Sequence, residues 1–468
     1  IKMRVAIVYP SFGVVAKVNQ PNIKAVADNY GIYPNTSLAY LAAALDEAGH
    51  DLIFLDGMAS GYSLSDMVKK IKLFKPEIMM FTITTYLYWE TLEMIKYFKK
   101  NFSAKIIVGG AHLGLYPKET LKDDIIDFGI IGEGEITTVE LLSALKNNSE
   151  LSKISGIVYR KNKKVKINSP RKLNNDLDSL PYPARNFLPM KKYYSFISKY
   201  RNYTIMITSR GCTFQCSFCE QRTGNIRYRS PENVVDEMEE CQNRYGVREI
   251  DIFDPLFTIN KKRVIEICKE IQKRKLKLAW SCRSRVDTID EETLIEMKKS
   301  GCYRIYYGIE SGDEEILRNI KKNTKISQIK KSINLTKKTG ILAFGYFMLG
   351  NPGETKKSII KTIKLAKELP LDYAQFSRSS ILPGTAQYEE WMKYYKEDYW
   401  NDFVKYGKIK EMKRLNTKLS DKELNFFIKK AYREFYFRPI QIFRILKNIK
   451  TVDEFLRYAK AGISMIMN

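Results

Sequence analysis

Apolar and polar positions alternate in two rhythms along the first third of the chain. Short, continuous apolar runs at 3–10, 51–57, 76–85 and 104–112 predict buried β-strands, and amphipathic stretches with helical spacing separate them. Strands that are apolar on both faces and alternate with helices are typical of a parallel sheet covered on both sides. We therefore predict an α/β class, with a doubly wound, Rossmann-like domain over residues 1–150.

Ligands of doubly wound domains bind outside the carboxyl ends of the strands. The strand ends predicted above would form one rim, whose members are Tyr9, Ser11, Thr82, Thr84, Thr85, Gly109, Gly110 and His112. Glycines at a strand end either let the backbone approach a large ligand or only turn the chain. The glycines alone leave both interpretations open.

The middle of the chain changes character and then returns to alternation. Residues 151–200 are polar and interrupted by prolines, which predicts a short hairpin and an extended linker. Six apolar strands with helical stretches between them follow, so we predict a partial (β/α)6 TIM-like barrel over 201–395. Residues 396–468 are predicted to form a helical C-terminal region.

Charge and composition limit the kinds of partner that we expect for this protein. Lys and Arg number 79 against 53 Asp and Glu, but this excess is spread along the chain without an Arg-rich or aromatic-interleaved motif, so nucleic acid is not the expected partner. Residues 421–468 combine apolar residues with a basic face, which predicts either a helix docked on the barrel or peripheral membrane association. No apolar run is long enough to span a membrane, and the first residues read as a strand, so we expect a cytoplasmic protein, peripheral on the membrane if 421–468 binds it.

Three of the seven cysteines, an odd number typical of reduced thiols, lie within eight residues directly after the first predicted barrel strand. Cys212, Cys216 and Cys219 have the spacing C-x3-C-x2-C, and no second pair exists to complete a zinc site. A four-iron cluster that only carries electrons takes four thiolates. Three thiolates would leave one iron free to bind another molecule.

This spacing, with Phe218 just before the last cysteine, resembles the signature of radical S-adenosylmethionine (SAM) enzymes. The resemblance implies that a [4Fe-4S] cluster binds SAM at its open iron and cleaves it to a 5'-deoxyadenosyl radical, which removes hydrogen from an unactivated carbon. It also implies an external electron donor of the ferredoxin or flavodoxin type. Positions matching the family's SAM site are Phe218, Asp254, Arg283, Arg285, Glu310, Ser311, Gly350 and Pro352. Each charged residue, taken alone, also fits an ordinary salt bridge of the barrel.

The N-terminal domain resembles the cobalamin-binding domain of one large subclass of these enzymes. The stretches "GGAHLGLYPKETL" and "DFGIIGEGEITTVELL" carry this likeness, which implies cobalamin as a cofactor and adds Gly132 and Glu133 to the rim. The D-x-H-x-x-G motif that supplies a histidine to cobalt is absent from the sequence. We therefore interpret His112 as part of the ligand rim, which leaves the lower ligand of cobalt open, and His50 as structural.

These resemblances leave several reactions open. The tail resembles that of members that cyclise porphyrins anaerobically or modify hopanoids and other lipids, so the first hypothesis is C–C bond formation or cyclisation on a large hydrophobic substrate (lipid, isoprenoid or porphyrin-like). The alternative is a cobalamin-dependent C-methyltransferase acting on a soluble metabolite or peptide. A remote alternative is tRNA methylthiolation, whose enzymes carry an additional three-cysteine domain and a β-barrel that this sequence lacks. The sequence singles out no further catalytic residue and no individual substrate.

Overall fold

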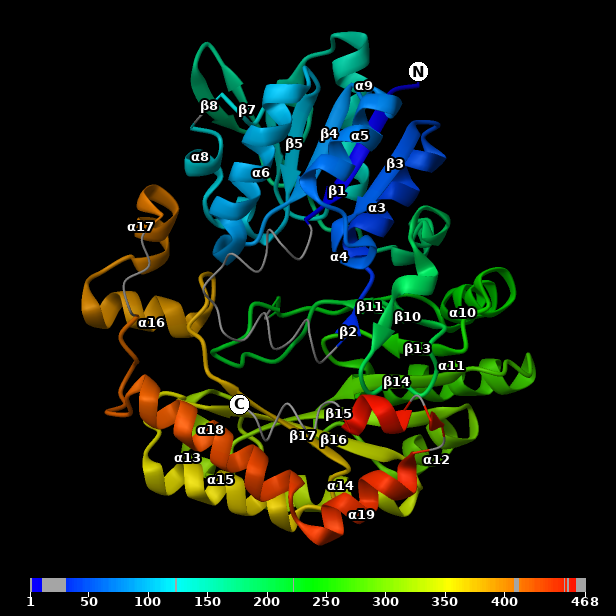
Figure 1. Ribbon diagram of the computed structural model, residues 1–468, viewed down its shortest axis with the longest axis vertical. Coiled ribbons are helices and arrows are strands. Elements are labelled where there is room, and N and C mark those ends of the chain that lie inside the picture. Colours follow the sequence, from blue (N-terminus) through cyan, green and yellow to red (C-terminus); the bar gives the residue numbers. More distant parts are fainter. Residues whose placement is uncertain are drawn as a thin grey trace. The chain divides into compact units, whose positions relative to one another are not determined.

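The computed structural model describes residues 2–10, 31–122, 124–221, 223–407, 412–449, 451–452 and 454–459 (Figure 1). The chain forms two compact units. The first consists of Ile1–Ser195 and Asp398–Lys410, and the second of Phe196–Glu397 and Glu411–Asn468.

The first unit is built on a seven-stranded sheet in the order β3-β1-β4-β5-β6-β7-β8. The strands from β3 to β6 are parallel, and β7 and β8 are antiparallel. Their bounds are β1 Arg4–Tyr9, β3 Asp51–Asp56, β4 Ile78–Thr82, β5 Lys105–Gly109, β6 Phe128–Ile130, β7 Ile157–Lys161 and β8 Lys164–Ile167. The strand order reverses between β1 and β4, and ligands of open α/β sheets bind at such a switch point.

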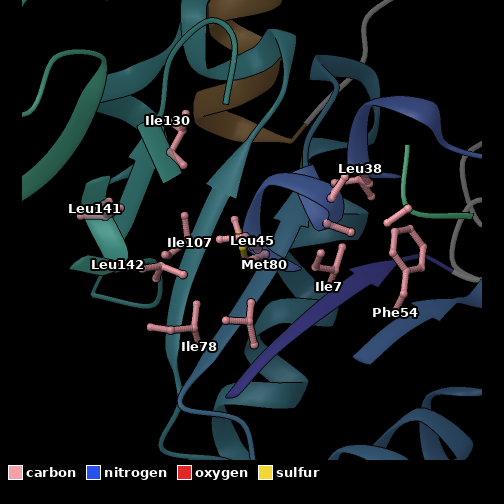
Figure 2. Packing of buried hydrophobic residues seen from close by; sticks show 14 of the residues in the cluster. Ile7, Leu38, Leu45, Phe54, Ile78, Met80, Ile107, Ile130, Leu141 and Leu142 are labelled. Carbon is pink, nitrogen blue, oxygen red and sulfur yellow. The ribbon is translucent and has the colours of Figure 1, made fainter. Parts of the chain in front are cut away.

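Helices cover both faces of this sheet. Apolar side chains of α3 (Thr36–Glu47) and α9 (Glu135–Asn147) pack on Ile7, Met80 and Ile107 (Figure 2). On the opposite face, α6 (Tyr88–Asn101) contacts β4 through Phe98 and Phe81, whose ring centroids are 6.0 Å apart. The remaining elements of this unit are β2 Gly31–Ile32, β9 Tyr194–Ser195, α4 Gly57–Ser60, α5 Leu64–Phe74, α7 Ala111–Leu115, α8 Pro117–Thr120 and α17 Tyr399–Tyr406. Helix α17 is joined to α6 because the Trp89 indole donates a hydrogen bond of 2.8 Å to the Phe403 carbonyl.

The second unit contains six parallel strands that follow one another in chain order. They are β10 Tyr203–Met206, β13 Glu249–Ile252, β14 Ala279–Ser284, β15 Cys302–Glu310, β16 Leu342–Leu349 and β17 Tyr373–Arg378. The helices between them are α10 Pro231–Tyr245, α11 Lys261–Lys273, α12 Glu291–Lys299, α13 Glu314–Asn319, α14 Ile326–Lys338 and α15 Lys356–Glu368. The short pair β11 Ser209–Arg210 and β12 Arg227–Tyr228 brackets the cysteine segment. The first and last strands, β10 and β17, do not pair among the described residues, so the barrel is partial, as predicted.

The C-terminal segment is helical and partly closes the barrel. Its helices are α16 Ala386–Tyr395, α18 Asp421–Tyr436 and α19 Pro439–Asn448. Helix α18 lies along β17, where the Tyr432 and Tyr436 hydroxyls accept hydrogen bonds from the backbone N–H groups of Phe376 and Ala374. These bonds satisfy an edge strand that would otherwise be open to pairing. Across the part of the chain that the structure describes, every helix is too short or too polar to span a bilayer.

Candidate active site

The cysteine segment forms a closed loop between β11 and β12. The Cys212 N–H donates to the Thr223 hydroxyl at 3.1 Å, and the Cys212 carbonyl accepts from the Gly224 N–H at 3.0 Å. Gly211 has φ of +93°, and a β-carbon there would overlap the Asn225 carbonyl oxygen. This position therefore requires glycine, which turns the chain from β11 into the loop.

The three predicted ligands lie within this loop. Cys212 and Cys216 are buried, whereas Cys219 is partly exposed. Burial raises the pKa of the Cys219 thiol, and the neighbouring charges of Cys216 and Cys212 raise this pKa further. No three His, Cys, Asp or Glu side chains of the described residues are arranged around a single ion. A cubane instead places each thiolate on a different iron, so the donor set fits a cluster that three thiolates hold at separate corners.

Charged side chains surround the thiols. The Arg285 guanidinium lies with Nη1 3.6 Å from the Cys216 Sγ and stacks on the Phe214 ring at 3.7 Å from its centroid. Its Nη2 donates to the Lys322 carbonyl at 2.8 Å. Burial raises the pKa of the Cys216 thiol, while the positive charges of Lys322 and Arg285 oppose this increase. Two cations therefore lie on one side of the loop, each paired with a carboxylate: Arg285 with Asp287 and Lys322 with Glu310.

Glu310 joins this group from the end of β15. Its Oε1 accepts from the Lys322 ammonium at 3.2 Å, and both side chains are less than a tenth exposed. Glu310 has φ of +68°, a left-handed conformation that non-glycine residues seldom adopt. A β-carbon at Gly308 would lie 2.5 Å from Glu310 Oε1 and 2.7 Å from Lys322 Nζ, so this glycine makes room for the pair.

Asp254 lies in the same region but supports the backbone. Its Oδ1 accepts from the N–H groups of Thr208 and Ser209, and its Oδ2 accepts from their hydroxyls, at distances from 2.6 to 3.1 Å. Asp254 therefore fixes the residues that lead into the cysteine loop. A contact between Asp254 and SAM stays a prediction.

Two of the remaining predicted SAM residues have side-chain partners within the second unit. Arg283 pairs with Asp251, with Nη1 2.9 Å from Oδ1, on the inner face of the sheet. The Ser311 hydroxyl lies 3.2 Å from that of Thr362, behind the end of β15. Phe218 is half-buried within the loop itself. Their contacts with SAM stay predictions.

The glycine-rich turn after β16 is held by a buried carboxylate. The Glu354 side chain accepts from the N–H groups of Gly350 and Asn351. Burial raises the Glu354 pKa to about 7, although these backbone bonds lower it in part. The Pro352 carbonyl accepts from the Asn319 amide at 3.3 Å, which ties the turn to the end of α13.

The cobalamin-type rim lies at the carboxyl ends of β1, β4, β5 and β6 in the first unit. Gly110 has φ of +103°, and a β-carbon there would lie 2.5 Å from the Ile83 carbonyl oxygen. The rim members with strand-end positions in the structure are Tyr9, Thr82, Thr84, Thr85, Gly109, Gly110, His112, Gly132 and Glu133. Ser11 lies outside the described residues.

His112 is wholly buried at this rim. Its Nδ1 is 3.2 Å from the Thr85 hydroxyl, and its ring stacks on Tyr88 with centroids 4.6 Å apart. Burial lowers the pKa of His112 to about 3, so the ring is neutral. Its Nε2 has no hydrogen-bond partner among the described residues. His50, by contrast, accepts a hydrogen bond from the Met3 N–H at 3.3 Å, in agreement with a structural role.

Sequence reasoning missed Lys322, Phe214 and Glu354. Lys322 lies in the basic run "RNIKKNTKI", where nothing distinguishes it from solvated lysines. Phe214 lies inside the cysteine motif, and the spacing between cysteines could have indicated it.

Comparisons with known proteins agree with this geometry. The model of the radical SAM superfamily matches residues 206–366, and that of the B12 binding domain matches residues 24–142. An uncharacterized methyltransferase of Pyrococcus horikoshii is 35% identical over 89% of this chain and 90% of its own length. The anaerobic magnesium-protoporphyrin IX monomethyl ester cyclase of Rubrivivax gelatinosus is 31% identical over 78% of this chain and 67% of its own length.

A solved structure shows the same fold. The cobalamin-dependent SAM radical enzyme OxsB, with aqua-cobalamin and SAM bound, superposes with a TM-score of 0.73 at 18% identity, covering 99% of this chain and 71% of its own. The predicted fold class is thereby confirmed, and the two domain matches confirm the predicted cofactors, a [4Fe-4S] cluster, SAM and cobalamin. The chain belongs to the radical SAM superfamily, among the members that carry a B12-binding domain ahead of the radical SAM domain.

Proposed function

We propose that this enzyme methylates an unactivated carbon of a large, mainly apolar substrate. The observation that carries the proposal is the presence, in one chain, of a three-thiol radical SAM loop and a B12-binding unit. The relative from Pyrococcus horikoshii, which aligns along nearly the whole of both chains, is named a methyltransferase.

The chain's own residues would hold and orient the reacting groups. Cys212, Cys216 and Cys219 would bind the cluster, and the loop that Asp254 fixes would set their positions. When bound, the cluster, SAM and cobalamin supply a radical that removes hydrogen and a methyl group that replaces it. The net charge of +26 would favour docking of an acidic electron donor of the ferredoxin or flavodoxin type.

An aromatic cluster lies on β15, β16 and β17 of the barrel sheet. Tyr306 and Tyr346 stack with centroids 5.8 Å apart, and Phe344 and Tyr373 continue the aromatic surface. Tyr346 is partly exposed, whereas Tyr306, Phe344 and Tyr373 are buried beneath it. Ile445 and Tyr458 of the C-terminal segment also pack on this cluster, so of the four rings Tyr346 is the one that could contact a large apolar substrate.

The test is anaerobic turnover with trideuteriomethyl-SAM, a reductant, hydroxocobalamin and an apolar extract of the source cells. Methylation predicts formation of both S-adenosylhomocysteine and 5'-deoxyadenosine, together with a deuteriomethyl-labelled apolar product. Cys216→Ala should form neither nucleoside product. The central assignment would be wrong if Cys216→Ala still formed 5'-deoxyadenosine.

Cyclisation or C–C bond formation is the second candidate, because the relative from Rubrivivax gelatinosus is a cyclase. The same assay separates the two reactions. Cyclisation predicts 5'-deoxyadenosine without S-adenosylhomocysteine, and an apolar product that carries no deuterium.

We further propose that the outer face of α19, together with Val452, Phe455 and Leu456, binds an anionic membrane surface. Of the 20 exposed large hydrophobic side chains among the described residues, eight lie between Phe437 and Leu456. Phe443 is 67% exposed and Leu446 is 53% exposed, with the exposed Lys447 beside them. Apolar side chains flanked by cations are typical of helices that lie in the interface of an anionic bilayer.

Vesicle flotation tests this surface without disturbing the barrel. Truncation at 421 would remove α18 from the edge of β17, so point variants are preferable. Phe443→Glu should reduce binding to anionic vesicles at least fivefold, whereas Tyr394→Glu, at a similarly exposed position of α16, should not. Equal binding to zwitterionic and anionic vesicles, or none, would contradict the proposal.

A further inference from the structure

The buried pair of Lys322 and Glu310 needs an explanation beyond stability. Lys322 is 6% exposed and Glu310 is 7% exposed, and removing both charges from water is costly. The chain also keeps Glu310 in a left-handed conformation and Gly308 without a side chain to accommodate them. Such strain persists where a local arrangement serves a purpose that apolar packing could not.

The pair is fixed to the cysteine loop by its backbone. The Ser217 N–H, next to Cys216, donates to the Ile320 carbonyl at 2.9 Å. The Lys322 carbonyl accepts from Arg285, whose other nitrogen reaches Cys216 Sγ. The turn that carries Lys322 therefore cannot move independently of the thiols.

We propose that Lys322 raises the reduction potential of the cluster held by Cys212, Cys216 and Cys219, and that Glu310 limits this increase by neutralising part of the lysine charge. The proposal rests on the proposed function of the three thiols as cluster ligands. Reduction of the cluster adds one negative charge, so a buried cation nearby stabilises the reduced form and a carboxylate opposes it. Net charge around an iron-sulfur cluster is one of the main determinants of its potential.

The two residues give predictions of opposite sign, which a merely structural role would not. In the SAM-free protein with a reconstituted cluster, Lys322→Met should lower the ratio of reduced to oxidised cluster at least tenfold at a fixed potential, equivalent to 59 mV for one electron. Glu310→Gln should raise this ratio. Lys322→Arg should retain a value close to that of the unmodified protein.

The measurement is a redox titration followed by electron paramagnetic resonance of the reduced cluster. Lys337→Met is the matched control, because Lys337 forms a 2.6 Å ion pair with Asp372 in the same unit and has no described contact with the cysteine loop. Like Lys322→Met, this variant leaves a carboxylate without its lysine. The control should leave the potential unchanged.

The outcomes separate this proposal from the function on which it rests. An unmodified protein that binds no iron and sulfide would refute both. A normal cluster whose potential moves in the same direction in Lys322→Met and Glu310→Gln, or no further than in Lys337→Met, would overturn the proposal and leave the cluster assignment intact. Weaker SAM binding by Lys322→Met without a shift in potential would instead identify Lys322 as a SAM ligand. If Lys322→Met does not assemble a cluster, the reduction potential of Glu310→Gln decides: an increase supports the proposal, and no increase overturns it.

Discussion

Replacing Asp254 with alanine should destabilise the backbone of the residues that lead into the cysteine loop. The Asp254 carboxylate is 0% exposed and accepts two backbone and two hydroxyl hydrogen bonds, all from Thr208 and Ser209. A hydrogen bond to a charged group contributes about 1.5–3 kcal/mol, and each buried donor left without a partner costs about 1–3 kcal/mol. Relaxation and water entry offset part of this sum, so we expect a loss of roughly 3–5 kcal/mol in local stability.

Asparagine at this position provides a sharper comparison. The two N–H donors share Oδ1, and the two hydroxyls share Oδ2, so an asparagine could accept from the backbone and donate to the hydroxyl oxygens. Asp254→Asn therefore keeps the two backbone bonds, reverses the two hydroxyl bonds and removes the charge, which we expect to cost about 1–2 kcal/mol.

Hydrogen exchange of the Thr208 and Ser209 amides measures the local opening free energy in each variant, and bound iron reports whether the loop still holds a cluster. Asp254→Ala should lose most of the local opening free energy and most of the bound iron. Asp254→Asn should retain the iron. Equal losses in the two variants would show that the charge, not the pattern of bonds, fixes the loop. A cost below about 1 kcal/mol for alanine would refute the reasoning altogether.

Three further predictions concern other parts of the chain. Gly110→Ala should destabilise the first unit by about 2–4 kcal/mol in urea unfolding, because its β-carbon would lie 2.5 Å from the Ile83 carbonyl oxygen at a φ of +103°; a cost below half of this range would contradict the geometry. Tyr436→Phe should cost about 1–3 kcal/mol by the same method, since the hydroxyl accepts from the Ala374 N–H and donates to the Ala374 carbonyl; an unchanged unfolding midpoint would refute it. Burial raises the Glu354 pKa from 4.5 to about 7, so the unfolded chain ionises first and stability should fall as pH rises from 4.5 to 7; Glu354→Gln should flatten this dependence, and an unaltered pH profile would exclude Glu354 as its cause.

Strand positions followed from the sequence because burial on both faces leaves a continuous apolar run. The strand predicted at 104–112 begins at Lys105, and the six barrel strands appear in the predicted order. Residues 157–161 show where the apolar pattern fails to indicate which sheet a strand joins. A polar, proline-rich context favoured a hairpin beside a linker, yet Ile157, Val158 and Tyr159 are buried because β7 pairs with β6 and continues the first sheet.

Side-chain partners around the cysteines depend on tertiary contacts that spacing does not encode. The cysteine motif predicted the loop, since C-x3-C-x2-C is specific. Lys322 could not be predicted, because its burial arises from the fold of the turn after α13 and not from its neighbours in sequence. Asp254 is an intermediate case: it follows a barrel strand, as the resemblance predicted, and the hydrogen bonds described above all join it to Thr208 and Ser209.

The buried charges of the second unit differ in what they can influence. Asp251 and Arg283 form an ion pair in the body of the sheet, where their opposite charges compensate one another at a distance of 2.9 Å. Glu310 and Lys322 lie instead at the carboxyl end of β15, where Arg285 links them to a thiol. Apolar residues of similar volume would stabilise a barrel at least as well as either pair. The pair in the body of the sheet has no described contact with the thiols, whereas Arg285 adds a second cation beside them, which Asp287 pairs through two hydrogen bonds. The thiol loop thus lies beside two cations, Lys322 and Arg285, whose charges Glu310 and Asp287 offset, so removing one cation or one carboxylate should change how readily a cluster with three thiolates accepts an electron.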